Sequence, residues 1–268
     1  VTDTITVGDN PFYSIILVGT KLYVPNFSAG TISVIDTATD TVVATIVVGT
    51  NPFYPVSVGT KLYISNRSSS SVSVIDTTTD TVIETISVGS VPYSSFVVGT
   101  NVYVPVEGDD LVAVIDTLTD TVSDTIAVGN GPDYAAVIGS TLYVSNNSGN
   151  TVSIIDLNTN TVIATRAVGV LPFYFSVFGL HAYLANAAGS SVSVINSLTN
   201  TVISTIAVGA GPSYMKQIGS EIYVPNGGSS SVSVIGTETI PPQLPNLVSF
   251  TSSTASGTYT TGQGINIT

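Results

Sequence analysis

Short runs of apolar residues alternate with polar turns along most of the chain, and this pattern returns every 40 residues. The clearest marker is the tripeptide Val34-Ile35-Asp36, whose equivalents begin at Val74, Val114, Ile154, Val194 and Val234. A period in this range is typical of a solenoid, a propeller or another repeat array, because one unit cannot bury its apolar faces alone. The pattern therefore predicts one repetitive body.

A single repeat, residues 52–91, predicts four short antiparallel strands. The apolar runs cover residues 54–58, 62–65, 71–75 and 81–88. Gly59 suits a tight turn between the first two runs, since glycine adopts a positive φ without strain. Asp and Thr residues fill the turn between the last two runs, where their side chains can bond to the backbone. Four such strands, A to D in order, match a propeller blade.

The two ends of the chain set the expected number of units. Six A, B and C strands are found, but the sixth C strand runs into "GTETIPP" in place of a D strand. Residues 1–8 have the D-strand pattern and no C strand before them. We therefore predict an all-β, six-bladed β-propeller over residues 1–238, in preference to an open β-solenoid, with the N-terminal strand closing the last blade. Such closure would remove the exposed edge of an open array.

Composition excludes several classes of partner. The chain has 5 Lys and Arg against 17 Asp and Glu, a net charge of -12, which disfavours nucleic acids and anionic lipids. No cysteine is present, so disulfides and thiolate-metal sites are not possible. No apolar run approaches the ~18 residues of a membrane span.

The repeat resembles the YVTN β-propeller repeat of archaeal and bacterial surface-layer and other extracellular proteins. The resemblance covers residues 1–237 and rests on Tyr23-Val24-Pro25-Asn26, Tyr143-Val144-Ser145-Asn146 and Tyr223-Val224-Pro225-Asn226. It implies the propeller fold and an extracellular or cell-surface location. Members often have seven blades, the turn between strands A and B is shortened to "VGT" here, and the third unit has Val106 in place of the Asn.

Aromatic residues recur where each D strand crosses to the next A strand. In a propeller these crossings share one face with the B-to-C loops, so the rings should gather near the channel mouth. They could stack on sugar rings or anchor a protein partner, or they could pack between neighbouring blades. The candidate binding residues are Phe12, Tyr13, Phe53, Tyr54, Tyr93, Tyr134, Phe173, Tyr174 and Tyr214.

Acidic residues offer candidate metal ligands. Pairs such as Asp36 with Asp40 could contribute to a weak calcium site, or they could cap the turns in which they lie. The cluster of Glu107, Asp109 and Asp110 interrupts the regular B-to-C loop of the third unit, which makes it the best candidate metal site. A solvated acidic loop is the alternative.

Sequons place candidate glycosylation sites at Asn26, Asn66, Asn146 and Asn266. Three of them share one position in the B-to-C loop, so glycans there would decorate one face. The recurrence of Asn in the repeat explains the same spacing without modification.

Catalysis finds little support, and no cofactor is expected. His181 is the only histidine, and a hydrolytic triad or a histidine-rich metal centre lacks its parts. A glycosidase-like pair of carboxylates stays open, because the sequence does not give separations in space.

The tail, residues 239–268, starts with a proline-rich spacer and ends in alternating apolar and polar residues. It is either the start of an immunoglobulin-like module or a strand donated to a neighbouring subunit. The sequence thus favours a non-catalytic structural or assembly module of a cell-surface, surface-layer or filament protein, which binds copies of itself or other surface proteins. The alternative is an adhesion propeller that binds carbohydrate or protein through the aromatic face.

Overall fold

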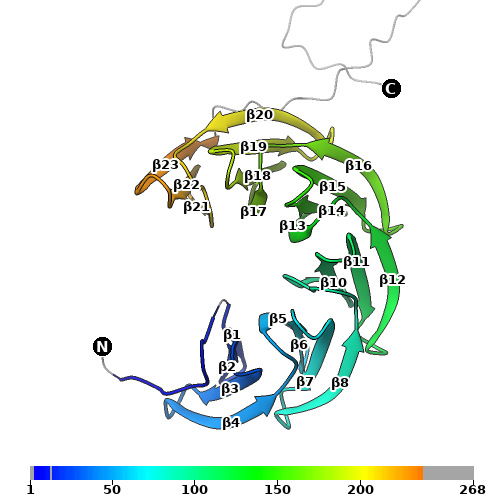
Figure 1. The fold of residues 1–268 in the computed structure, drawn as a ribbon, viewed down its shortest axis with the longest axis vertical. Helices are drawn as coiled ribbons and strands as arrows, with labels where there is room; N and C mark the ends of the chain where they lie inside the picture. Colours follow the sequence, from blue (N-terminus) through cyan, green and yellow to red (C-terminus); the bar gives the residue numbers. More distant parts are fainter. Residues whose placement is uncertain (1–2, 13, 238–268) are drawn as a thin grey trace, which may run out of the picture.

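The computed structural model describes residues 3–12 and 14–237, which form an all-β array of six antiparallel sheets. Each sheet contains the strands of one repeat and is called a blade below, numbered 1 to 6 along the chain. Figure 1 shows the blades arranged in an arc, with the first strand of each blade inside and the fourth on the outer rim. The prediction of four strands per repeat is confirmed for five blades.

The strands of blades 1 to 3 are β1 (Ile16–Val18), β2 (Lys21–Asn26), β3 (Thr31–Asp36), β4 (Thr41–Val47), β5 (Pro52–Val58), β6 (Lys61–Asn66), β7 (Ser71–Asp76), β8 (Thr81–Ser87), β9 (Phe96–Val98), β10 (Asn101–Val106), β11 (Leu111–Asp116) and β12 (Thr121–Ala127). Those of blades 4 to 6 are β13 (Pro132–Ile138), β14 (Thr141–Asn146), β15 (Thr151–Asp156), β16 (Thr161–Ala167), β17 (Pro172–Phe178), β18 (His181–Asn186), β19 (Ser191–Asn196), β20 (Thr201–Ala207), β21 (Lys216–Ile218), β22 (Glu221–Asn226) and β23 (Ser231–Gly236).

The turns follow the residue types that the repeat supplies. Gly59 has a φ of 58° at the turn between β5 and β6, as predicted. Asp80 has a φ of 55° at the turn between β7 and β8, in the left-handed region that Asp and Asn tolerate better than most residues. The side chain of Asp76 accepts the backbone N–H of Thr78 at 2.8 Å, so the first acid of this pair caps its turn.

The core lies in the seams between neighbouring blades. In the seam between blades 1 and 2, Tyr23, Ile32 and Val34 of the first blade pack against apolar residues of the second, among them Leu62 and Ile64. All five of these side chains have 0% exposed surface. Each blade is therefore stabilised mainly by the next one rather than by itself.

A tyrosine hydroxyl bridges each of the first four seams to the turn between the third and fourth strands of the next blade. Tyr63 donates to Asp120 Oδ1 of the next blade at 2.6 Å, and Lys61 Nζ lies 2.6 Å from the other oxygen of that carboxylate. The equivalent tyrosine hydrogen bonds join Tyr23 to Asp80, Tyr103 to Asn160 and Tyr143 to Asn200.

In every blade except the third, a buried asparagine lies against the glycine of the incoming crossing segment. Asn66 Nδ2 donates to Ser71 Oγ at 3.1 Å and to Ser73 Oγ at 2.9 Å, while its Oδ1 accepts the N–H of Gly49 at 3.1 Å. A Cβ on Gly49 would lie 2.6 Å from Asn66 Cβ, so this close approach requires glycine. Blade 3 replaces the whole network by apolar residues, with Val106, Leu111 and Ala113 in place of Asn, Ser and Ser.

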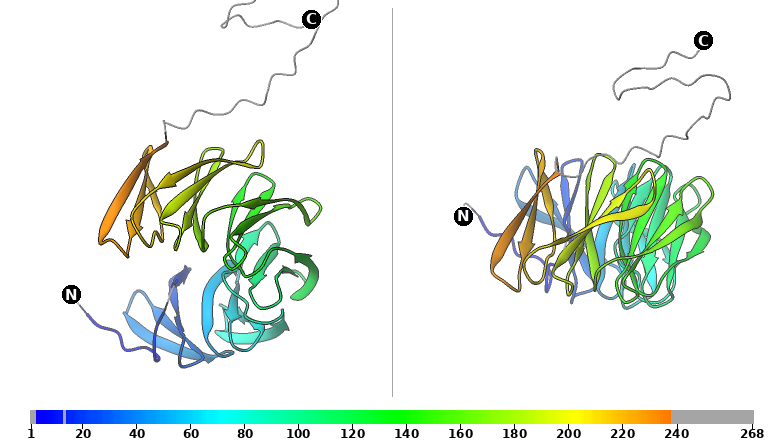
Figure 2. Two further views of the ribbon diagram at one scale, coloured as in Figure 1. Left: turned by 45° about the horizontal axis from the view of Figure 1, so that its top comes forward. Right: turned by 90° about the horizontal axis from the view of Figure 1, so that it is seen from above.

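The predicted closure of the last blade by the N-terminal strand is wrong in this structure. Blade 6 has three strands, β21 to β23, and residues 3–7 have no β-bridge partner among the described residues. Figures 1 and 2 show blades 1 and 6 at the separate ends of an open arc. The reason is geometric: five seams fix the angles between blades, and together they do not complete a circle. The predicted roles of the tail, residues 239–268, lie outside the described residues.

The apolar version of the network in blade 3 gives a direct test of the asparagine in blade 2. Changing Asn66→Val leaves the hydroxyls of Ser71 and Ser73 buried without this donor, so we expect the free energy of unfolding to fall by about 2 kcal/mol. The triple variant Asn66→Val, Ser71→Leu, Ser73→Ala copies blade 3 and should recover most of the loss. Urea unfolding monitored by circular dichroism measures both. A triple variant less stable than the single one would contradict this account.

Candidate functional site

Aromatic side chains meet on the face that carries the crossings into each blade and the B-to-C loops. We call this group the aromatic cluster, and it consists of Phe12, Phe27, Phe53, Tyr54, Tyr93, Tyr134, Phe173, Tyr174 and Tyr214. The structure therefore brings together the rings predicted from the sequence. Tyr13 lies outside the described residues.

Ring contacts run without a break from blade 1 to blade 6. The centroid separations are 5.9 Å for Phe12–Phe27, 6.4 Å for Phe27–Phe53, 4.8 Å for Phe53–Tyr93, 5.7 Å for Tyr93–Tyr134, 4.7 Å for Tyr134–Phe173 and 5.4 Å for Phe173–Tyr214. All six contacts are edge-to-face, the arrangement that the ring quadrupole favours. The cluster is thus an aromatic core that joins all six blades on one face.

Tyr134 is the centre of the cluster. Its ring also contacts Tyr54 of blade 2 and Tyr174 of blade 5, and its hydroxyl lies 3.1 Å from that of Tyr214. Burial raises the pKa of Tyr134 well above its usual range, and burial raises that of Tyr214 to about 12. Only 2% of Tyr134 is exposed, against 38% of Tyr214 and 43% of Phe12, so the outer rings are the ones a ligand could reach.

Phe27 belongs to the cluster but was not predicted from the sequence. It follows Asn26 in a B-to-C loop, whereas the predicted rings all follow the crossings between blades. The signal that could have found it is the aromatic residue inside an otherwise polar loop, on the same face as the crossings.

The predicted metal site at Glu107, Asp109 and Asp110 is not formed. Glu107 pairs with Arg67 at 2.8 Å, and Asp109 accepts the N–H of Ser90 at 2.7 Å. Asp110 accepts the N–H of Gly131 at 2.8 Å. The three carboxylates therefore serve three separate partners, and the described part of the chain contains no group of three or more acidic, His or Cys residues able to hold a metal ion.

A charged group does form beside the aromatic cluster, from Arg67, Glu107 and Asp133. Arg67 lies 5.0 Å above the centre of the Tyr93 ring and pairs with Glu107. Asp133 is 6% exposed, and its Oδ1 has no hydrogen-bond partner in the part of the chain that the structure describes. Burial, with a smaller contribution from the negative charge of Glu107, raises the pKa of the Asp133 carboxyl to about 8, against a smaller opposing effect of Arg67.

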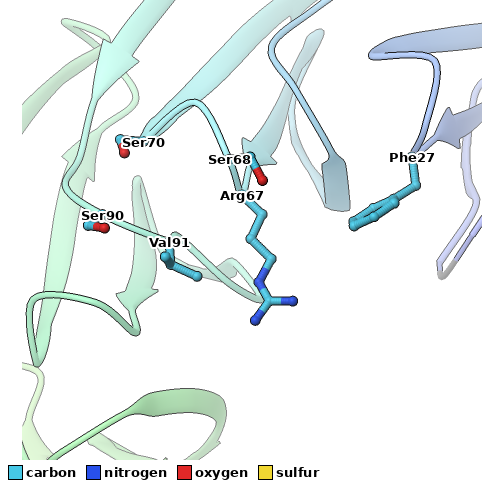
Figure 3. Close-up of a pocket in the computed structure, with 6 residues that line it drawn as sticks. All are labelled: Phe27, Arg67, Ser68, Ser70, Ser90 and Val91. Carbon is cyan, nitrogen blue, oxygen red and sulfur yellow. The ribbon is translucent and has the colours of Figure 1, made fainter.

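A shallow pocket of about 310 Å³ opens beside the same arginine. Figure 3 shows the guanidinium of Arg67 extending into this opening between Phe27 and Val91. Ser68, Ser70 and Ser90 supply the polar part of the lining. A cation, an aromatic edge and hydroxyl groups therefore surround one opening on the aromatic face.

The sequon asparagines occupy structural positions. Asn26, Asn66 and Asn146 are all 0% exposed, and the Nδ2 of each donates two hydrogen bonds within its blade. Glycosylation at these three positions does not fit the folded structure, because the nitrogen that would carry the glycan is enclosed. Asn266 lies outside the described residues.

His181 lies on β18, at the position that holds Lys61 in blade 2. Burial lowers its pKa, and its Nε2 has no hydrogen-bond partner within residues 3–12 and 14–237. The ring lies 6.5 Å from that of Tyr183, at the opposite end of its strand from the aromatic face.

The ends of the arc expose surfaces that the interior blades bury. Val232 and Val234 on β23 are 59% and 52% exposed, whereas their equivalents Val192 and Val194 on β19 are 0% exposed. Tyr223 has no following blade to bond and donates to Glu221 of its own strand at 2.8 Å. Among the described residues, no strand therefore pairs with the outer side of residues 231–234, and the side chains of Val232 and Val234 form an exposed apolar face.

Comparison with known proteins supports the fold without giving a family. No protein-family model matches the sequence, and no curated protein matches it. Hydrazine synthase of Kuenenia stuttgartiensis is similar over 88% of this chain and 98% of its own, at 18% identity and a TM-score of 0.58. BamB of Moraxella catarrhalis is similar over 82% of this chain and 70% of its own, at 16% identity and a TM-score of 0.64.

The dihydro-heme d1 dehydrogenase NirN is similar over 82% of this chain and 53% of its own, at 14% identity and a TM-score of 0.68. At these identities the likeness concerns the fold alone. Repeated four-stranded antiparallel sheets in an arc and these structural neighbours together define an all-β protein of the β-propeller class. The described residues form no helix that could cross a membrane.

The buried carboxyl of Asp133 predicts a pH dependence of stability. Its pKa is about 8 in the folded chain, against an ordinary value of 3.8. Between these two pH values the carboxyl is therefore protonated in the folded state and ionised in the unfolded state. Stability should therefore fall as pH rises from about 4 to about 8. Asp133→Asn cannot ionise and should show a smaller fall. Thermal unfolding at several pH values measures the effect.

The matched control is Asp124→Asn, which changes an exposed carboxylate on β12. This variant should keep the pH dependence of the unchanged protein. If Asp133→Asn and the unchanged protein lose stability equally between pH 4 and 8, Asp133 is not the group responsible.

Proposed function

We propose that the protein is a non-catalytic structural module that assembles through the open ends of its arc of blades. The observation that carries the proposal is the outer side of residues 231–234 in β23, where no described strand pairs and where Val232 and Val234 are more than half exposed. An uncovered strand edge beside an apolar face is a surface on which another β-strand can pair.

The sequence of β23 supports this interpretation. Natural edge strands are usually protected by charges, proline or a bulge, yet β23 reads "SVSVIG" and has none of these residue types. Its equivalent inside the array, β19, has nearly the same residues and is fully buried. The edge of blade 6 thus keeps the composition of a strand that is covered by a partner.

The proposed location is extracellular or at the cell surface, in a surface-layer or filament protein. The resemblance to the YVTN repeat supports this part, as does a surface with few charged residues and many Ser and Thr. The predicted partners are copies of the same chain or other surface proteins, and assembly through the tail is a further option.

Lysine on the edge of β23 tests the proposal. Val232→Lys with Val234→Lys places two cations where the partner strand would pack, so we expect the mass of the assembled particles to fall to that of the monomer. Light scattering after size-exclusion chromatography, together with electron microscopy, measures particle size. Leu118→Lys is the control, because Leu118 is 79% exposed in a turn of blade 3, away from either end of the arc. An unchanged protein that is monomeric at all concentrations would refute the proposal.

A second candidate function is carbohydrate or protein binding at the aromatic face. It is favoured by the pocket beside Arg67 and by the partly exposed rings of Tyr214 and Phe12. An aromatic face next to hydroxyl groups and one cation offers both stacking and hydrogen bonding to a sugar ring.

Binding to a panel of soluble oligosaccharides, measured by calorimetry, tests this second function. Arg67→Ala and Tyr214→Ala should each weaken binding by about tenfold, since each removes one well-placed contact. Leu180→Ala is the control, because this exposed residue lies at a turn between strands A and B on the opposite face. Equal affinities of all three variants would place any binding elsewhere.

A further inference from the structure

We propose that the edge of β23 pairs with residues 3–7 of a second copy of the chain, so that copies join head to tail. The inference rests on the proposed function and names its partner and its register. Within the described part of one copy, residues 3–7 have no bridge partner, and no fourth strand lies beside residues 231–234 of β23. Head-to-tail association completes blade 6 of one copy with a strand from the next.

Gly8, just after residues 3–7, meets blade 1 as Gly49, just after β4, meets blade 2. A Cβ on Gly8 would fall 2.5 Å from Asn26 Cγ, and a Cβ on Gly49 would fall 2.6 Å from Asn66 Cγ in the next blade. Ile5 precedes Gly8 by the same spacing that separates Ile46 from Gly49. The segment is therefore placed like the end of β4, but the blade to which it would belong is absent from its own chain.

The register follows from pairings inside the chain. In blade 1, Ile32 pairs with Ile46 and Val34 pairs with Ala44. The equivalent pairs across two copies are Val232 with Ile5, Ser231 with Thr6, Ser233 with Thr4, and Val234 with Asp3. The last pair also has precedents, because Val74 faces Glu84 and Val114 faces Asp124 across their strands.

The same association would complete a seam of the kind found inside the arc. Tyr23, Ile32 and Val34 pack against Leu62 of the next blade. Their equivalents at the end of the arc, Tyr223, Val232 and Val234, would pack against Leu22 of the second copy. Leu22 is only partly buried in this structure, whereas Leu62 is fully buried. Both incomplete faces would be covered by one contact.

One position in the proposed contact is unfavourable and gives a specific test. Tyr23 and Tyr63 each bond an aspartate 57 residues further along, in the next blade, beside a lysine that pairs with it. By that spacing Tyr223 would bond Asp40 of the second copy, and Glu221 would take the place of the lysine. Two carboxylates would then meet, so association should be weaker at neutral pH than the other seams suggest.

Cysteine cross-linking tests the register, and the chain has no cysteine of its own to confuse it. We expect the double variant Val232→Cys, Ile5→Cys to give, on oxidation, a ladder of covalent dimers and higher multimers in electrophoresis without reductant. The control is Val232→Cys, Thr4→Cys, because neighbouring residues of a strand point to opposite faces. Val232→Cys alone reports any contact between two copies of β23.

Each outcome decides a different point. A ladder from the first pair only supports the proposal, and a cross-link confined to the monomer overturns it in favour of closure within one chain. Assembly seen by light scattering without the ladder, or equal ladders from both pairs, overturns the register while the proposed function stands. Monomers throughout overturn both.

Glu221→Lys provides an independent gain-of-association test. It would copy the pairs of Lys21 with Asp80 and Lys61 with Asp120, and it should lower the dissociation constant by about 3- to 10-fold. Sedimentation velocity over a range of concentrations measures the constant. The double variant Glu221→Lys, Asp40→Lys restores like charges and should lose the gain. An unchanged constant for Glu221→Lys would overturn the placement of Glu221 beside Asp40.

Discussion

The structure depends on one constraint, that a blade of this repeat is covered only when another blade packs against it. Each seam joins a tyrosine and aliphatic residues of one blade to aliphatic residues of the next, and these side chains lose nearly all contact with water. Burial of apolar area is the main favourable term in folding, so an isolated blade would lose the part of that term that comes from the seams. The strict 40-residue spacing keeps every seam in the same register.

The seams also explain how charges are distributed along the repeat. Asp80 and Asp120 each meet a lysine and a tyrosine of the preceding blade. Where the lysine is replaced, by Asn101 and then by Thr141, the acceptors are Asn160 and Asn200. A partly buried carboxylate without a cation would lower the stability of the fold, whereas an uncharged amide accepts the same hydrogen bond without burying a charge. The two positions have changed together within one chain.

Local pattern was sufficient to predict the strands and turns but not the way the array ends. The alternation of apolar and polar residues predicted the four strands per blade, and Gly59 and the Asp and Thr residues before the last strand predicted turns that the structure contains. Closure failed because it depends on the angle between blades, which is set by packing across the seams and leaves no local signature. The sequence likewise shows that Asn66 recurs at the equivalent position of other repeats. It does not show that the side chain of Asn66 is buried and bonded to Ser71 and Ser73.

The candidate site could be predicted only in part, because packing between blades decides which side chains meet. A shared face follows from topology, so the gathering of the rings was predictable, while their packing on one another around Tyr134 was not. The group of Arg67, Glu107 and Asp133 comes from three different blades, and only the structure places them together.

The two ends of a repeat array are chemically the two halves of one interior seam. A closed ring joins them within one molecule and an open arc leaves them apart, so the sum of the angles between blades decides between a ring and a chain. In this structure that sum falls short of a circle, while β23 keeps the residues of a covered strand. An exposed edge with an interior composition is a hazard unless something pairs with it. The segment that best fits the edge is residues 3–7, because the equivalent fourth strands pair with the third strand in five blades of the same molecule.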